Sequence, residues 1–510
     1  MNTYKILAEN FKSYSNLSFE PDYSFARSKA KRISEAKVSL EIAVFSDLKE
    51  LKKELSTIPG TQNLVKGIKG EDDFQTFSVP LSSLFTQLFL YFPKSISNFK
   101  RHELIRKNIK NVKNFEQIII NLKKCKVNEE RILEDIYLFL KFNAWTYPKM
   151  TQKKAKAAKV IELWIFSTVR FSRLTKFLDN LDLQVEANFV TRTLAELAPN
   201  MLHVDSYVDF IKSYQKKNKS LKLKVYDYDK LEKMGAGCFT AVSRASRSDS
   251  KQKGAAMVVL EYNPSKKKAT DLALVGKGLC YDSGGYNVKT GNYMRGMKRD
   301  MTGSAVAFSV FNYLVQSGYK GYLKCYLGIS ENHISPDAFK MDEVLSTISG
   351  KTVEVIHTDA EGRMVLTDVL SFVSKEGTKQ LIDFATLTGT AVRAIGVKRG
   401  TLFVRNEDNI AKALSAGAQS GERVWNFPIG DEYTEDLKES TVADLYQCST
   451  KGYADHIYAA SYLSEFVDPK IDWCHLDLSP DTCPGGLGLV SSEVTGFGVR
   501  WAIEYIQGRK

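Results

Sequence analysis

The sequence predicts an α/β protein with a smaller N-terminal α/β domain and a larger C-terminal α/β domain on a mainly parallel sheet. At 510 residues the chain is long enough for two or three domains with large cores. Strand-like and helix-like segments alternate along it, which is typical of α/β folds. The alternation is most regular between residues 256 and 396, where it indicates successive βαβ units. We place the domain boundary so that the domains are 1–180 and 181–510.

The smaller domain shows both strand and helix patterns but no cluster of catalytic side chains. The expected strands are residues 38–47 and 160–167. Apolar residues recur at helical spacing in residues 81–96, 101–124 and 129–142.

A mostly helical stretch, residues 172–215, is interrupted at Pro199 and is expected to connect the two domains. Strand patterns and helix patterns then follow one another. The expected strands are residues 222–228, 256–262, 271–276, 321–328, 352–356 and 380–385, and the expected helices are residues 301–318, 363–374 and 389–396.

Composition narrows the class of protein and its compartment. No apolar run approaches the roughly 18 residues that a membrane-spanning helix needs, so no membrane association is expected. The seven cysteines are scattered and never form CxxC, which favours reduced thiols in the cytoplasm. The N-terminus makes a poor transit peptide, and a mitochondrial location is kept as the alternative. Six histidines without an HExxH pattern argue against a histidine-based metal site.

The net charge of +13 is concentrated in the front of the chain. Residues 1–200 hold 33 Lys and Arg against 22 Asp and Glu, a net charge of +11. A solvated lysine-rich surface explains this excess, and a surface for nucleic acid or an acidic partner is the alternative. No pattern of a dedicated nucleic-acid module accompanies it.

One cluster of charged residues lies between the end of a predicted strand and the start of a predicted helix. Asp359, Glu361 and Arg363 fall within five residues, directly after the strand 352–356. In α/β proteins, sites collect at the carboxyl ends of strands. Alone, the two carboxylates could merely complement the amino end of the following helix.

A second cluster follows the strand 271–276 and contains Lys277, Asp282, Lys289 and Asp300. We expect the two strands to be neighbours in one parallel sheet, which would bring four carboxylates together at one edge. Such carboxylates would repel one another unless cations lie between them. Two divalent ions that share carboxylates resolve this, and oxygen ligands favour Mn²⁺ or Mg²⁺, with Zn²⁺ as a further candidate.

These residues carry a resemblance to a known family. The blocks VGKGLCYDSGG, MKRDMTGSA and TDAEGR, in this order and followed by Thr386 to Gly389, resemble the M17 leucyl aminopeptidase (cytosol aminopeptidase) family. The resemblance is strong from about residue 230 to 396. It implies a macro-like N-terminal domain, a dimetal catalytic domain, peptide substrates and a homohexamer built as a dimer of trimers.

The resemblance also assigns metal ligands. One ion would be held by Asp282, Asp359 and Glu361, and the other by Lys277, Asp282, Asp300 and Glu361. A lysine binds metal only as the neutral amine, so its pKa would have to fall well below about 10.4. A metal-bridging water would then be the nucleophile near neutral pH.

The remaining assignments concern the substrate. Lys289 matches the catalytic lysine that polarises the scissile carbonyl, and Arg363 matches the arginine that holds a bicarbonate acting as general base. Met297, Thr386 and Gly389 match the pocket for the first side chain, which implies release of Leu and other apolar residues from peptide N-termini.

Three departures from the family pattern are visible. Residues 338–343, AFKMDE, lack the Arg-Pro-Gly that is usual there. His357 stands where the motif usually has Asn, and we expect it to pack or hydrogen-bond beside the ligands. Residues 479–482, SPDT, differ from the usual small residues. The alternative function is a non-enzymatic or second role as a nucleic-acid-binding oligomeric scaffold that uses the basic N-terminal domain.

Overall fold

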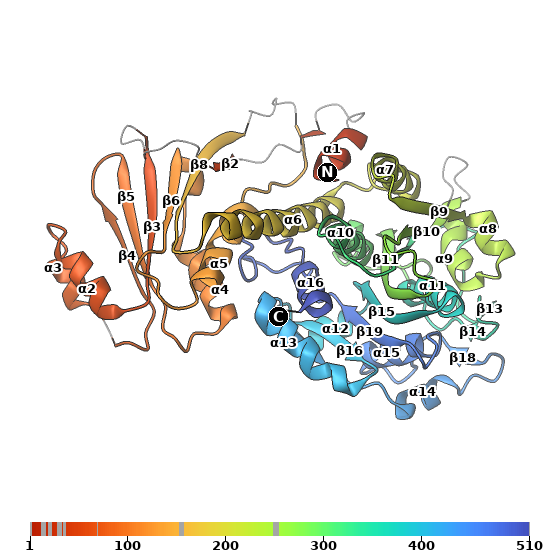
Figure 1. Cartoon of the computed structure of the whole chain (residues 1–510). Helices are drawn as coiled ribbons and strands as arrows, with labels where there is room; N and C mark the ends of the chain where they lie inside the picture. The colour runs from red at the N-terminus through yellow and green to blue at the C-terminus, as the bar shows by residue number, and fades with distance from the viewer. Residues whose placement is uncertain are drawn as a thin grey trace. The chain divides into compact units, whose positions relative to one another are not determined.

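The computed structural model describes residues 3–11, 17–18, 23–27, 33, 37–68, 70–151, 158–247 and 254–508. Their contacts divide the chain into two compact units (Figure 1). Unit 1 comprises Met1–Leu17, Glu186–Pro484 and Glu493–Lys510, and unit 2 comprises Ser18–Val185 and Gly485–Ser492. Within the described residues, no helix has both the length and the apolar character that crossing a membrane requires.

Unit 2 is built on a six-stranded sheet in the order β2-β8-β6-β3-β5-β4, parallel except for the β4–β5 pair. Its strands are β2 (Tyr23–Arg27), β3 (Ser39–Phe45), β4 (Gln75–Pro80), β5 (Phe85–Tyr91), β6 (Gln117–Asn121) and β8 (Lys159–Phe166). Its helices are α2 (Leu48–Ser56), α3 (Gln62–Lys66), α4 (Asn98–Asn108), α5 (Glu129–Phe142) and the first part of α6 (Phe171–Glu196). The described elements before α6 also include the two-residue strands β1 (Leu17–Ser18) and β7 (Lys149–Met150) and a 3-10 turn at Val112–Asn114.

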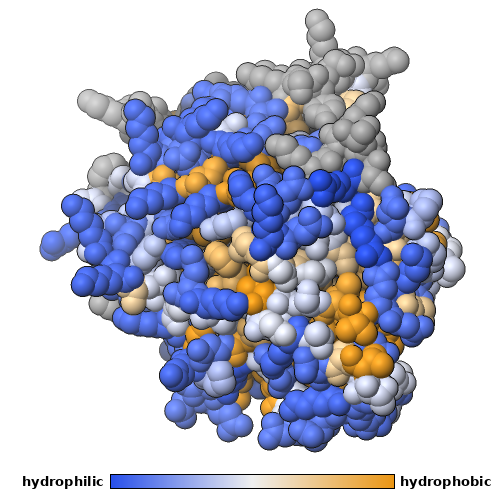
Figure 2. Space-filling view, turned by 90° about the vertical axis from the view of Figure 1, so that its right-hand side faces the viewer, coloured by the Kyte–Doolittle hydropathy of each residue, from blue (hydrophilic) through white to orange (hydrophobic). Residues whose placement is uncertain are grey.

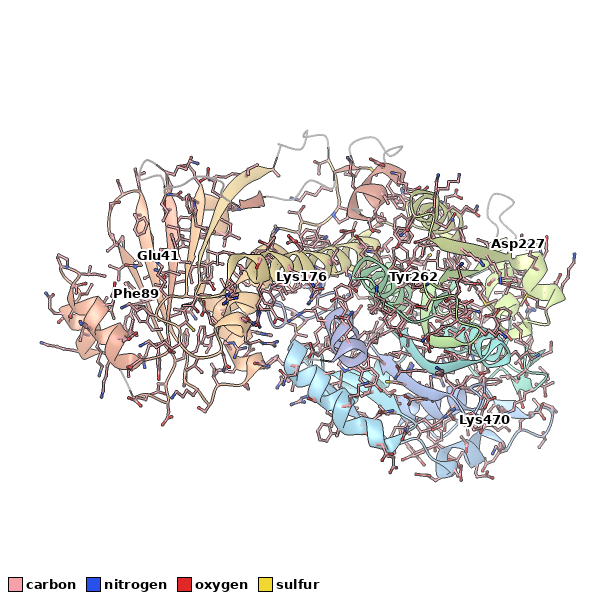
Figure 3. The ribbon with its side chains drawn as sticks, in the orientation of Figure 1. Glu41, Phe89, Lys176, Asp227, Tyr262 and Lys470 are labelled. Carbon is pink, nitrogen blue, oxygen red and sulfur yellow. The ribbon has the colours of Figure 1, made fainter. Side chains whose placement is uncertain are left out.

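The helical prediction for residues 81–96 is wrong, because this segment forms β5. The strand lies between β3 and β4, and Leu88 to Tyr91 are all buried. A strand that is covered on both faces reads as a continuous apolar run, which periodicity cannot separate from a helix. Figure 3 labels Phe89 on β5 and Glu41 on β3; Glu41 accepts hydrogen bonds from the side chains of Gln87 and Asn121.

The expected helix over residues 101–124 is also only partly right. It ends at Asn108 and is followed by β6, whose isoleucines 118–120 are buried in the sheet. The helix expected over residues 129–142 is confirmed as α5.

Unit 1 is built on an eight-stranded mixed sheet in the order β17-β16-β19-β15-β11-β12-β10-β9, with a parallel centre formed by β19, β15, β11 and β12. Its strands are β9 (Leu221–Asp227), β10 (Ala255–Tyr262), β11 (Thr270–Asp282), β12 (Leu323–Asn332), β15 (Thr378–Ala385), β16 (Gly400–Val404), β17 (Val424–Asn426) and β19 (Asp472–Asp477). A separate three-stranded sheet contains β13 (Val344–Ser346), β14 (Thr352–Glu354) and β18 (Leu445–Tyr446).

Helices pack on the large sheet and around it. They are α1 (Thr3–Asn10), α7 (Val204–Lys217), α8 (Tyr228–Lys233), α9 (Gly237–Arg247), α10 (Thr302–Gln316), α11 (Glu361–Glu376), α12 (Gly389–Ile395), α13 (Ile410–Ser420), α14 (Asp431–Leu437), α15 (Asp455–Ser464) and α16 (Val499–Gln507). Short 3-10 turns occur at Met297–Arg299 and Glu407–Asn409. Viewed from the side of α8 and β14, the surface is largely hydrophilic, with hydrophobic patches between the hydrophilic residues (Figure 2).

Strand β11 shows why glycine and lysine alternate in the motif VGKG. A Cβ on Gly276 would lie 2.4 Å from the Cα of Ser304, so this face of β11 touches the start of α10. Side chains of a strand alternate between faces, and Lys277 therefore points to the other face. There it meets Gly362 of α11, where an added Cβ would lie 2.3 Å from the lysine Cε. The sheet is thus sandwiched between α10 and α11, with Lys277 buried beneath α11.

Candidate active site

The ten residues that the sequence singled out all lie around one cavity of about 910 Å³ in unit 1. They are Lys277, Asp282, Lys289, Met297, Asp300, Asp359, Glu361, Arg363, Thr386 and Gly389. A smaller cavity of about 450 Å³, beside Tyr262 and Val315, has no charged side chain in its lining.

The two charged clusters reach this cavity from different sheets, which corrects the expectation of neighbouring strands. Lys277 and Asp282 belong to β11 at the centre of the large sheet, whereas Asp359 and Glu361 follow β14 of the small sheet. The sequence neighbours of a motif do not show which sheet a short strand joins. The clusters meet because α11, which starts at Glu361, packs against β11.

Hydrogen bonds between the two ligand-bearing loops fix their spacing. Asn332 Nδ2 lies 2.9 Å from Asp282 Oδ1 and 3.1 Å from the backbone oxygen of Thr358. The Thr358 backbone N–H donates to Asn287 Oδ1, while Thr358 Oγ1 donates to the backbone oxygen of Gly284. Both loops are therefore held by side chains that are not themselves candidate ligands.

The side chain of Gln447 also holds the loop that carries Asp359, through hydrogen bonds to the backbone on both sides of this residue. Its Oε1 accepts the backbone N–H groups of Ile356 and His357, and its Nε2 donates to the backbone oxygen of Ala360. His357 Nδ1 accepts the backbone N–H of Asp359 at 3.2 Å. His357 thus hydrogen-bonds beside the carboxylate cluster in this fold, as the sequence led us to expect.

The carboxylates form a tight group. Oxygens of Asp282, Asp359 and Glu361 all lie within 4.8 Å of one another. Lys289 Nζ lies 2.8 Å from Asp282 Oδ2 and also pairs with Asp359. Hydrogen bonds from the Gly284 backbone and the Asn332 side chain reach Asp282 Oδ1, which leaves its Oδ2 facing Lys289.

The second part of the group surrounds Lys277, which is 2% exposed. Its Nζ lies 2.7 Å from Asp300 Oδ1, 3.3 Å from Glu361 Oε1 and 2.8 Å from the backbone oxygen of Thr386. Thr386 Oγ1 also donates to Asp300 Oδ1. In contrast, Asp300 Oδ2 and Glu361 Oε2 are buried without a hydrogen-bond partner.

The site contains four carboxylates but only two ammonium groups, and this excess of acids shifts the pKa values of the carboxyl groups. Burial raises the pKa of Asp300 well above its usual value, and the charges of Glu361 and Asp282 raise it further against the opposing effect of Lys277. Burial and Asp359 likewise raise the pKa of Asp282, although Lys289 opposes this. The site thus holds more negative charge than its own lysines neutralise.

The lysines respond in the opposite sense. Burial alone would lower the pKa of Lys277, but Asp300, Glu361 and Asp282 outweigh it and raise that pKa. The pKa of Lys289 is raised against burial by Asp282 and Glu361. The lowered pKa that metal ligation by Lys277 requires would therefore have to come from bound cations.

The expected pocket for a first side chain lies at the same cavity. Met297 sits in a 3-10 turn before α10, Thr386 follows β15, and Gly389 begins α12. Asp477 at the end of β19 accepts the backbone N–H groups of Leu387 and Thr388, which fixes this loop. Asp477 lay in the part of the sequence where the motifs fade, so sequence reasoning gave it no role.

Comparisons with known proteins agree on one family. The cytosol aminopeptidase family, catalytic domain, matches residues 189–503. The chain is 32% identical over 384 residues to the probable cytosol aminopeptidase of Sulfurihydrogenibium sp. (strain YO3AOP1), covering 75% of each chain. It is 37% identical over 287 residues to that of Aquifex aeolicus (strain VF5), covering 56% of this chain and 57% of the relative.

A solved structure supports the fold class. Leucyl aminopeptidase from Leishmania major, in complex with actinonin, superposes with a TM-score of 0.77 at 21% identity, covering 99% of this chain and 97% of that one. The similarity confirms the two-domain α/β architecture expected from the sequence.

Proposed function

The chain belongs to the M17 cytosol aminopeptidase family and is a peptidase of the hydrolase class, and we propose that it releases the N-terminal residue from peptides in a metal-dependent reaction. We further propose that Leu and other apolar residues are preferred at the N-terminus. The observation that carries the proposal is the excess of buried carboxylates over lysines around one cavity.

The donor set fits two divalent ions. Asp300 Oδ2 and Glu361 Oε2, the two buried oxygens without partners, would each coordinate a cation. The positive charge would also relieve the repulsion that raises the carboxyl pKa values. We assign one ion to Asp282, Asp359 and Glu361, and the other to Lys277, Asp282, Asp300 and Glu361. Mn²⁺ fits the carboxylate donors best, and Zn²⁺ and Mg²⁺ are the further candidates.

Bound ions of this kind activate water near neutral pH and polarise a carbonyl group. Lys289, an ammonium group at the cavity, would donate to the carbonyl oxygen as negative charge develops there, an effect usually worth about 3–4 kcal/mol per donor. Met297, Thr386 and Gly389 would contact the first side chain. The Asp477 contacts would keep Thr386 and Gly389 in place during binding.

Bicarbonate on Arg363 remains a prediction from the family resemblance, and the contacts of Arg363 bear on it. Its Nη2 is already occupied by the carboxylate of Asp455, so a bicarbonate could reach this nitrogen only by displacing that side chain.

The proposed cell compartment is the cytoplasm, in keeping with the names of the relatives. A homohexamer is proposed from the resemblance, and size-exclusion chromatography with light scattering tests it. Nucleic-acid binding by the basic N-terminal domain is not favoured by the comparisons; a salt-titrated DNA-binding assay would reveal it as a second role.

The decisive experiment for the proposed function is a substrate panel. Purified protein is incubated with peptides or amides that differ in the N-terminal residue, each with Mn²⁺, Zn²⁺, Mg²⁺ or Co²⁺. We expect metal-dependent release with apolar residues preferred. If no substrate is hydrolysed with any ion, the proposal is wrong.

A further inference from the structure

The guanidinium group of Arg363 has a carboxylate partner within this chain. Its Nη2 lies 2.9 Å from both Oδ1 and Oδ2 of Asp455, and its Nη1 lies 3.4 Å from the backbone oxygen of Gln447. Arg363 is 2% exposed, whereas the Asp455 side chain is 36% exposed and lines the cavity together with Asp359 and Glu361. The carboxylate is therefore the more exposed partner of the pair at the cavity.

Asp455 is held in this place by its own backbone. It is the first residue of α15, and the preceding Ala454 has φ 51°, in the left-handed region that costs a non-glycine residue about 1–2 kcal/mol. The backbone oxygen of Ala454 accepts the N–H groups of Ile457 and Tyr458 at the start of the helix. A carboxylate in the first turn is also favoured by the helix dipole.

The pair belongs to a packed helix interface and is not a chance surface contact. Thr367, one turn after Arg363 on α11, has its Oγ1 2.8 Å from the backbone oxygen of Arg363 and 2.9 Å from the hydroxyl of Tyr462 on α15. Thr367 and Tyr462 are fully buried. The spacing of the two helices around the pair is therefore fixed from within the core.

A free anion on Arg363 would meet two obstacles. At Nη2 it would compete with Asp455, and at either of the other two nitrogens it would place a second negative charge near that carboxylate, which like-charge repulsion disfavours. A covalently tethered carboxylate also needs no association from solution, so its effective concentration is high.

We infer that Asp455 takes the place of bicarbonate in this protein, as the resident anion on Arg363 and the base of the hydrolysis. The inference rests on the proposed function. In the step, a water O–H proton passes to the Asp455 carboxylate while the water oxygen bonds to the carbonyl carbon. The same proton then passes to the leaving nitrogen as the C–N bond breaks, which returns Asp455 to the carboxylate.

The test compares three proteins in buffer depleted of carbon dioxide, with and without added bicarbonate. Wild type should change its kcat by less than about twofold on addition of bicarbonate. Asp455→Gly, which opens the space, should lose about 10²-fold or more in kcat and regain part of it with bicarbonate. Asp455→Asn fills the same space without a charge, so it should be slow and should not be rescued.

A second readout does not depend on activity. In metal-free protein, bicarbonate should raise the melting temperature of Asp455→Gly but not that of wild type. Glu435→Gln, an exposed acid on α14, is the matched control and should behave as wild type in both measurements. If Asp455→Gly does not fold, Asp455→Ser serves as the opened variant.

Three results would overturn the inference: strong activation of wild type by bicarbonate, wild-type activity of Asp455→Gly or Asp455→Asn without it, or a folded Asp455→Gly that bicarbonate neither restores nor stabilises. Failure of every protein to hydrolyse peptides with any metal would instead contradict the proposed function. The metal-free melting experiment would still decide whether Asp455 excludes bicarbonate.

Discussion

Two buried ionic clusters in this protein have opposite charge balances. In unit 2, the Asp135 carboxylate on α5 meets three basic groups: Arg101 Nε and His102 Nε2 on α4, at 2.6 and 2.8 Å, and Arg131 one turn earlier on α5, at 3.6 Å. In unit 1, four carboxylates surround Lys277 and Lys289. Both clusters are buried, but only the unit 1 cluster has more acids than bases.

The ratio of acidic to basic groups in each cluster determines whether the pKa values of its carboxyl groups are raised or lowered. Burial would raise the pKa of Asp135, yet His102 and the two arginines outweigh it and lower that pKa. In unit 1, burial and like charges raise the pKa values of Asp282 and Asp300. The basic groups compensate the charge of Asp135, whereas the unit 1 carboxylates outnumber their lysines, and this difference is our reason for proposing the unit 1 cluster as the functional one.

The largest expected effect comes from removing a shared ligand of the unit 1 cluster. Glu361→Gln keeps the shape but loses the charge that both proposed ions share. We expect kcat/KM to fall by about 10³-fold or more, because several kcal/mol of metal-derived stabilisation are lost. Peptide hydrolysis and bound metal are measured on the same samples. Unchanged activity would show that the excess of acids serves another purpose.

The next largest effect is expected at Lys289, which we propose polarises the substrate carbonyl and does not hold the metal ions. Lys289→Met should lower kcat by about 10²–10³-fold while the metal content changes little. Lys438→Met, an exposed lysine paired with Glu435, is the matched control. Loss of metal in Lys289→Met would move this lysine from substrate polarisation to assembly of the site.

Removal of the carboxylate from the unit 2 cluster should lower the stability of unit 2 and leave catalysis unchanged. Asp135→Ala leaves Arg101 and His102 without their carboxylate, and we expect a loss of about 3–5 kcal/mol in the free energy of unfolding of unit 2. Hydrogen exchange should accelerate over α4 and α5. Glu130→Gln on the same helix removes an exposed pair with Arg173 and should cost at most about 1 kcal/mol.

The lowered pKa of Asp135 also gives a sign for its pH dependence. The unfolded state binds the proton more readily than the folded state, so this stabilisation is present above the ordinary Asp pKa and is lost as the pH falls towards the folded-state value. Acid unfolding of wild type should therefore be steeper than that of Asp135→Ala. Equal slopes would mean that the cluster is not charged in the folded protein.

A smaller effect is expected from Asp368, a buried carboxyl of α11 without a basic partner among its pKa determinants. Burial raises its pKa from 3.8 to about 7, although the backbone N–H groups of Ile348 and Phe239 lower it. The unfolded state then binds fewer protons between these values, so stability falls as the pH rises from about 4 to 7, by at most about 1.4 kcal/mol per pH unit. Asp368→Asn should flatten this slope in urea unfolding at several pH values. An unchanged slope would contradict the raised pKa.

Local patterns predicted the fold class and the two charged clusters, and the family resemblance assigned the pocket residues Met297, Thr386 and Gly389. Lys277, Asp282 and Glu361 sit in short blocks whose order and spacing are visible along the chain. The sequence could not show that β14 belongs to the small sheet, because a strand of only three residues contains no signal that identifies its partner strand. It also mistook β5 for a helix, because burial on both faces removes the strand alternation.

The missed residues share a physical reason. Asn332, Gln447 and Asp455 act through contacts with residues between 26 and 92 positions away. Their side-chain types are common on surfaces, so nothing local distinguishes them. Only the fold places Gln447 behind the ligand loop and Asp455 on Arg363.

We propose that the four carboxylates of unit 1, which outnumber the lysines beside them, hold two metal ions. The most direct measurement is the metal content of the purified protein by mass spectrometry after equilibration with Mn²⁺ or Zn²⁺, together with peptide hydrolysis before and after chelation. We predict two ions per chain in wild type, fewer in Glu361→Gln, and hydrolysis that stops on chelation and returns with metal. A chain that binds no ion in this cavity, or that hydrolyses peptides equally well after chelation, would contradict the proposed two-metal site.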